Sequence, residues 1–154
     1  HPGNLMWLPD RTGIEQTGLI DFQGAMMGPA PYDLVNLLDD ARREVPQALR
    51  EECLKKFNEG IAAEDREAFL AWYPVLATQF HCRVIGQALK LAIRDGKDRL
   101  LTIIPILRRH LQRDLSNPQL KPLKDWFAAQ CIDFTENSNF DLSQTAVHIR
   151  SDAF

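Results

Sequence analysis

The stretch "HPGNLMWLPDRTGIEQTGLIDFQGAMMGPAPYDLVNLL", residues 1–38, decides the fold of this chain. It contains two short apolar runs, residues 5–8 and 17–20, and the turn-forming residues 9–13 lie between them. Two apolar runs joined by such a turn predict a β-hairpin. This is the one clear strand signal in the sequence, so we expect a mainly α fold class in which a short β-hairpin is followed by a helical bundle.

Apolar residues at helical spacing fill most of the sequence after residue 30. Pro31 suits the first turn of a helix, and Asp33 would lie in that turn. Further helices are expected over residues 46–60, 64–95 with a break at Pro74, 98–115 with an interruption at Pro105, and 118–131. We therefore expect one lobe over residues 1–132, followed by a polar tail over residues 133–154.

The charge balance and the cysteines narrow the class of protein. The chain of 154 residues carries 18 Lys and Arg against 21 Asp and Glu, a formal net charge of −3. That balance argues against a nucleic-acid partner and against a polybasic membrane anchor, and no apolar run is long enough to span a bilayer. Cys53, Cys82 and Cys131 form no disulfide or zinc pattern. We interpret them as core or surface thiols and expect a reducing, cytoplasmic location.

Polar side chains flank the predicted hairpin at one end. Asn4 precedes the first apolar run and Asp21 follows the second. If the two runs pair, Asn4 and Asp21 become neighbours, and an amide oxygen beside a carboxylate suits Mg²⁺. The alternative is structural, because Asn and Asp are common turn residues and Asp33 suits a helix start.

Residues 1–38 resemble the catalytic core of the aminoglycoside phosphotransferase and choline kinase family, which has the protein-kinase-like fold. Its members carry H-x-D-x-x-x-x-N, a short hairpin, I-D-F/W-x-x-A and P-x-x-Y-D-L, and the last two motifs match residues 20–25 and 29–34 here. The resemblance implies that Asn4 and Asp21 hold Mg²⁺ against the phosphates of ATP. It also implies that Asp33 is buried and braces the catalytic loop.

The sequence departs from the family pattern at the catalytic base. That base is the Asp of H-x-D-x-x-x-x-N, and counting back from Asn4 places it ahead of His1. The resemblance thus implies a C-terminal lobe that contains no catalytic base. Its partner would be the N-terminal lobe of the same protein, and this chain alone is expected to be inactive.

Two segments point to the substrate. Residues 21–46 and 83–105 resemble a branch of bacterial kinases that phosphorylate N-acetylmuramate and N-acetylglucosamine at the anomeric hydroxyl. Acidic and basic residues are interleaved after the first helix. This mixed set suits a sugar with a lactyl carboxylate better than a polycationic aminoglycoside, and Asp40 and Arg42 are the candidate substrate residues. The alternative is that these charges form the solvated end of a helix.

These observations predict an ATP- and Mg²⁺-dependent kinase of a small-molecule hydroxyl, with an amino sugar as acceptor. An aminoglycoside or another small alcohol is the alternative substrate. Trp72 and Tyr73 suggest an aromatic cage for a choline-type ligand as a further alternative. The structural interpretation is that these aromatic residues belong to a helix core. A non-catalytic helical domain that binds a partner is the second class of function.

Overall fold

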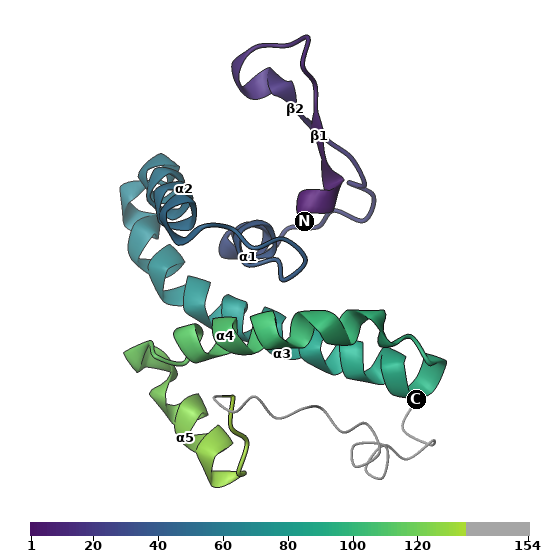
Figure 1. The fold of residues 1–154 in the computed structure, drawn as a ribbon. Helices are drawn as coiled ribbons and strands as arrows, with labels where there is room; N and C mark the ends of the chain where they lie inside the picture. Colours follow the sequence, from purple (N-terminus) through teal and green to yellow (C-terminus); the bar gives the residue numbers. More distant parts are fainter. Residues whose placement is uncertain (135–154) are drawn as a thin grey trace. The chain divides into compact units, whose positions relative to one another are not determined.

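The structure is a computed structural model that describes residues 1–134. The chain divides into two compact units, of which the first comprises His1–Phe80 and the second begins at His81. The described residues form one short hairpin followed by helices (Figure 1), which confirms the predicted fold class. Of the predicted tail, all but Asp133 and Phe134 lies outside the described residues, and the single lobe over residues 1–132 stays a prediction.

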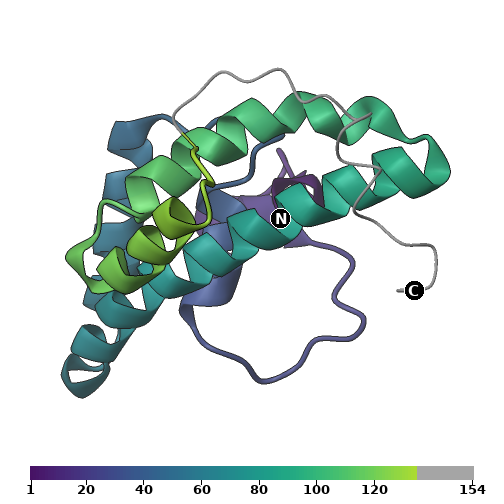
Figure 2. The same ribbon diagram turned by 90° about the horizontal axis from the view of Figure 1, so that it is seen from below.

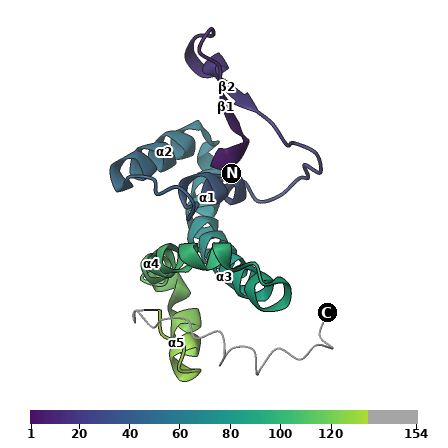
Figure 3. The ribbon, with the colours of Figure 1, turned by 45° about the vertical axis from the view of Figure 1, so that its right-hand side comes forward.

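The hairpin consists of two antiparallel strands, β1 (Leu5–Trp7) and β2 (Thr17–Leu19). Leu5 pairs with Leu19, Met6 with Gly18 and Trp7 with Thr17, so the predicted hairpin is confirmed. A 3₁₀ turn, η1 (Pro2–Asn4), leads directly into β1, and a second, η2 (Gly13–Gln16), precedes β2 (Figure 3). The pairing places the start of β1 beside the end of β2.

Two helices follow the hairpin in the first unit, α1 (Pro31–Leu38) and α2 (Gln47–Gly60). Pro31 lies in the first turn of α1, where its missing N–H costs no hydrogen bond. Leu34, Val35 and Leu38 are buried on one face of α1, which is the amphipathic pattern expected from the sequence. Both helices begin where the prolines predict.

The long helix α3 (Arg66–Asp95) follows a 3₁₀ turn, η3 (Ala63–Asp65), and it continues through Pro74. The predicted break at Pro74 is therefore wrong. Proline removes one backbone hydrogen bond, but Phe69, Tyr73 and Ala77 are buried on the same side of the helix. Burial of these side chains offsets the local cost of the proline.

The predicted end of α3 at Gly96 is confirmed. Gly96 has a φ of 64°, a left-handed conformation that favours glycine. The N–H of Lys97 donates to the carbonyl oxygen of Leu91 over 3.1 Å, which closes the last turn of the helix.

The second unit contains the last part of α3 and the remaining helices. These are η4 (Asp98–Ile103), α4 (Ile104–Asp114), η5 (Pro118–Leu120) and α5 (Lys121–Ala129). Pro105 lies in the first turn of α4, where the 3₁₀ turn gives way to the α-helix, so the predicted interruption marks a change of helix type. Figures 1 and 2 show α4 lying alongside the end of α3. Leu107 and Leu111 of α4 are fully buried.

Within residues 1–134, none of the helices combines the length and the apolar character that crossing a membrane requires.

Candidate functional site

The two polar residues at the open end of the hairpin contact each other. The side-chain amide of Asn4 donates from Nδ2 to Oδ2 of Asp21 over 3.2 Å. The N–H of Ile20 also donates to the backbone oxygen of Asn4 over 3.1 Å, which extends the pairing beyond the last strand residues. The sequence-based expectation that Asn4 and Asp21 are neighbours in space is confirmed.

The backbone is in an unusual conformation at Asp21, and Asn4 is held by a turn. Asp21 has a φ of 58°, in the left-handed region that residues with a side chain seldom adopt. Asn4 ends a 3₁₀ turn in which its N–H donates to the carbonyl oxygen of His1 over 2.9 Å. Residues held in sparsely populated backbone regions cluster at functional sites, so the conformation of Asp21 is a second reason to place a site here.

The chemistry of this pair fits a hard cation. Asp21 is exposed and offers a carboxylate, while the half-buried Asn4 uses Nδ2 for the contact and keeps its amide oxygen as a donor to a metal. Within the described residues, no group of three or more His, Cys, Asp or Glu side chains could hold a metal ion. Two protein oxygens suit Mg²⁺, which usually keeps several waters and binds substrate phosphates as well.

Asp33 occupies the first turn of α1, as predicted, but its side chain is exposed. The expectation of a buried aspartate is therefore wrong in this structure. Leu34, Val35 and Leu38 take the buried face of the helix, and Asp33 lies on the other side at helical spacing. Its position near the helix N-terminus favours its negative charge, and its role in bracing the catalytic loop stays a prediction.

Asp40 and Arg42 bind each other tightly. Nε of Arg42 lies 2.9 Å from Oδ1 of Asp40 and one terminal nitrogen lies 2.5 Å from Oδ2, while the backbone N–H of Arg42 donates to Oδ1 over 2.8 Å. Asp40 is buried, so the idea that these charges form a solvated helix end is wrong for this residue. Burial alone would raise the pKa of Asp40, but the hydrogen bonds and charge of Arg42 hold that pKa below its ordinary value.

A buried cluster of Asp39, Arg50 and Tyr73 was missed by the sequence analysis. Nε of Arg50 donates to Oδ1 of Asp39 over 2.8 Å, and the hydroxyl of Tyr73 donates to Oδ2 over 3.2 Å. The guanidinium of Arg50 also lies 5.4 Å from the centre of the Tyr73 ring. The cluster joins the end of α1 to α2 and α3, and the ring of Tyr73 already faces a cation.

This cluster argues against the aromatic cage. Tyr73 is buried and bound to Arg50, whereas its neighbour Trp72 is half exposed. Adjacent residues of a helix point in different directions, so the two rings do not enclose one ligand.

In the second unit, His81 is fully buried and its Nδ1 lies 2.7 Å from Oδ2 of Asp114. His81 is therefore a core histidine whose Nδ1 is paired with a carboxylate. Burial and the charge of Asp114 raise the pKa of the Cys82 thiol, which fits a thiol of the core rather than a nucleophile.

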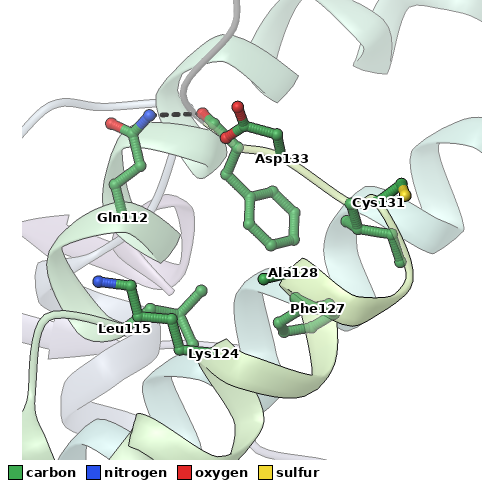
Figure 4. A pocket seen from close by; sticks show the side chains of 9 residues that line it. Gln112, Leu115, Lys124, Phe127, Ala128, Cys131 and Asp133 are labelled. Atoms are coloured by element: carbon green, nitrogen blue, oxygen red, sulfur yellow. Dashed lines mark hydrogen bonds between the residues drawn. The ribbon is translucent and has the colours of Figure 1, made fainter.

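Each unit also contains a pocket that sequence reasoning did not find. One, of about 370 Å³, lies between the starts of α1 and α3. The other, of about 420 Å³, lies between α4, α5 and the residues that follow α5 (Figure 4), where Nε2 of Gln112 donates to the carbonyl oxygen of Phe134 over 2.5 Å. Its rim reaches Phe134, the last residue that the structure describes.

The comparisons with known proteins agree with the motifs. Residues 1–54 match the model of the phosphotransferase enzyme family. The chain is 39% identical over 127 residues to the N-acetylmuramate/N-acetylglucosamine kinase of Caulobacter vibrioides. The aligned residues are 82% of this chain and 35% of that protein. It is 34% identical over 116 residues to the kinase of the same name from Neisseria meningitidis, covering 71% of this chain and 33% of that protein.

A third relative, from Pseudomonas putida and also named N-acetylmuramate/N-acetylglucosamine kinase, is 31% identical over 134 residues. The chain spans roughly a third of the length of these relatives. The resemblance drawn from residues 1–38, and the branch to which it pointed, are both confirmed.

Proposed function

We propose that the protein transfers a phosphoryl group from ATP to a hydroxyl of an amino sugar, because residues 1–54 match the model of the phosphotransferase enzyme family. N-acetylmuramate and N-acetylglucosamine, which name its relatives, are the proposed acceptors. The observation that carries the proposal is the contact between Asn4 and Asp21, because it brings an amide and a carboxylate side chain together at the end of the hairpin.

Asn4 and Asp21 have the metal-binding role in this proposal. Bound Mg²⁺ would supply positive charge that neutralises the phosphates of ATP. The carboxylate of Asp21 and the amide oxygen of Asn4 would hold the ion. The hydrogen bond between the two side chains fixes the amide so that its nitrogen faces Asp21 and its oxygen stays available.

We infer that these residues work together with a segment ahead of His1. The family motif places the catalytic base there, and the aligned residues are only 35% and 33% of the length of the first two relatives. Large apolar side chains also lie exposed around the hairpin, with Trp7, Leu19 and Phe22 each more than 65% accessible. An apolar patch of this kind suits contact with another part of the protein, for which the N-terminal lobe is the proposed partner.

Within the predicted substrate pair, we propose Arg42 alone as the residue that contacts an acceptor. Asp40 is buried and its oxygens accept the hydrogen bonds of Arg42, whereas about half of the Arg42 side chain is exposed. A lactyl carboxylate is the acceptor group that Arg42 would bind.

The same contacts favour a sugar over an aminoglycoside. A polycation needs free carboxylates, but Asp39 is paired with Arg50 and Asp40 with Arg42. The two acidic residues that follow α1 are therefore already neutralised by neighbouring arginines.

The test uses the full-length protein with ATP and Mg²⁺ and follows ADP release on N-acetylmuramate, N-acetylglucosamine, kanamycin and choline. We expect turnover on an amino sugar, a loss of at least ~100-fold in kcat for Asp21→Asn, and near-normal turnover for Asp10→Asn, an exposed aspartate in the hairpin turn. Activity on kanamycin or choline alone would refute the acceptor. If the protein released no ADP with any of the four substrates, the proposed kinase activity would be refuted.

The chain of residues 1–154 is the matched control for the inferred N-terminal partner. It is expected to release no ADP under the same conditions, because the proposed base lies ahead of His1. Turnover by this chain alone would contradict that part of the proposal.

A further inference from the structure

The pocket of the first unit has two walls of different character. One wall is Pro29, Ala30 and Pro31, at the start of α1. The other is formed by Ile61 and by residues at the start of α3. The lining is mostly apolar, and Asp65 is its one charged residue.

This second wall, formed by the end of η3 and the start of α3, presents an aromatic ring and a carboxylate on one side. Asp65, Ala68, Phe69 and Trp72 all line the pocket, and they follow the spacing that brings side chains to one side of a helix. The small side chain of Ala68 leaves room between Asp65 and Trp72. Trp72 is 52% exposed, so a large part of its indole ring is available to a ligand.

The pocket is built on a rigid base. Phe69 is buried at its floor, with its ring centre 5.3 Å from that of Phe57. Arg66 ties α3 to the end of α2, because its Nε donates to the carbonyl oxygen of Ile61 over 3.2 Å and a terminal nitrogen donates to that of Glu59 over 3.1 Å. On the opposite wall the prolines restrict the backbone. A preformed pocket loses little conformational entropy when it binds a ligand.

The chemistry of the lining selects the class of ligand. An anion is disfavoured because the lining contains a carboxylate and no cation, and a polycation would find only a single carboxylate. A sugar ring matches both features, since it has an apolar face of C–H groups and an edge of hydroxyl donors. Pockets for small ligands commonly combine an apolar and aromatic lining with a few polar groups that fix orientation.

We propose that this pocket binds the ring of the acceptor sugar, with the indole of Trp72 against the apolar face of the ring and the carboxylate of Asp65 accepting a hydrogen bond from a ring hydroxyl. The inference rests on the proposed function and names the residues that would recognise its substrate. Asp65 would repel a lactyl carboxylate, so the hydroxyl-bearing edge of the ring faces this residue.

The pocket and Arg42 lie at opposite ends of α1. The eight residues of this helix span about 12 Å. A single sugar ring held against Trp72 therefore does not also contact the guanidinium of Arg42, which is bound to Asp40. The pocket offers a cavity and an aromatic face, whereas Arg42 offers a guanidinium already bound to a carboxylate. We therefore place the ring in the pocket rather than at Arg42, and this placement replaces the contact between Arg42 and a lactyl carboxylate.

Two variants of the full-length protein test the inference, each with a matched control. Trp72→Ala is compared with Trp126→Ala, since Trp126 is 53% exposed and lies in the other unit. Asp65→Asn is compared with Asp98→Asn, because both aspartates are exposed and lie in short 3₁₀ turns. The measurements are KM and kcat for N-acetylglucosamine, KM for ATP, and calorimetric binding of the sugar without nucleotide.

We expect Trp72→Ala to raise the KM for the sugar about tenfold or more and to weaken sugar binding in parallel, with the KM for ATP unchanged. Trp72→Phe keeps an aromatic face and should recover most of the affinity. Thermal unfolding of each variant checks that the fold is intact. Wild-type sugar affinity in both Trp72→Ala and Asp65→Asn would overturn the inference, as would a loss of sugar affinity in Arg42→Gln alone.

Failure of the inference and failure of the proposed function are distinguishable. Wild-type protein that transfers phosphate to the sugar, with variants that behave like their controls, refutes the pocket and leaves the kinase. Wild-type protein that binds N-acetylglucosamine through Trp72 but transfers no phosphate refutes the kinase and leaves the pocket as a sugar site.

Discussion

The buried cluster of Asp39, Arg50 and Tyr73 allows a quantitative prediction of stability. The side chain of Asp39 is fully buried and that of Arg50 is only 12% exposed. Replacing Arg50 with alanine leaves the Asp39 carboxylate in the core with the hydroxyl of Tyr73 as its remaining donor in the cluster. Removing one partner of a buried ion pair costs about 3–5 kcal/mol, and the retained hydrogen bond from Tyr73 places the expected loss near ~3 kcal/mol.

Urea unfolding followed by circular dichroism measures this loss. With a urea dependence of about 2 kcal/mol/M, a loss of ~3 kcal/mol lowers the midpoint by roughly 1.5 M. Lys55→Ala in the same helix is the matched control, because Lys55 and Glu59 form an exposed pair at 3.9 Å that contributes at most ~0.5 kcal/mol.

A double variant separates the lost charge pair from the lost packing. Asp39→Asn combined with Arg50→Met removes both charges, and we expect it to recover at least half of the loss caused by Arg50→Ala. A midpoint for Arg50→Ala equal to that of Lys55→Ala would refute the reasoning, since the cluster would then add nothing to stability.

Two further predictions follow from the pKa shifts. The folded-state pKa of Asp40 lies below its ordinary value of 3.8, so this carboxylate contributes stability that is complete above about pH 4 and is lost as the pH falls through the folded-state pKa. Arg42→Gln should flatten the dependence of unfolding free energy on pH in that acidic range, and an unchanged profile would contradict the assignment. The pKa of the Cys82 thiol is raised by burial and by the charge of Asp114, so at pH 7.5 iodoacetamide should modify the exposed Cys131 well before Cys82, as peptide mass spectrometry would show. Equal modification rates at Cys82 and Cys131 would argue against the raised pKa of the Cys82 thiol.

The features that could be predicted from the sequence depend on residues close together along the chain. Turn residues between two apolar runs were enough to predict the hairpin, and antiparallel pairing then brings Asn4 and Asp21 together. The helix ends at Pro31 and Gly96 follow from backbone restrictions of single residues.

The features that could not be predicted depend on packing between elements. Asp39, Arg50 and Tyr73 meet only because three helix segments pack together, and no spacing in the sequence relates them. At Pro74 a local rule predicted a break, but burial of the surrounding side chains keeps the helix continuous. Asp33 was placed correctly along α1, but which side of the helix it occupies depends on which face the core takes.

The central claim is that Asn4 and Asp21 together hold the metal ion that accompanies ATP. The most direct measurement is the electron paramagnetic resonance signal of Mn²⁺ titrated into the full-length protein with ATP, for wild type, Asp21→Asn and the control Asp10→Asn. We predict that wild type and Asp10→Asn bind Mn²⁺ in an ATP-dependent manner and that Asp21→Asn loses this binding by at least ~10-fold. Unchanged Mn²⁺ affinity in Asp21→Asn would contradict the claim.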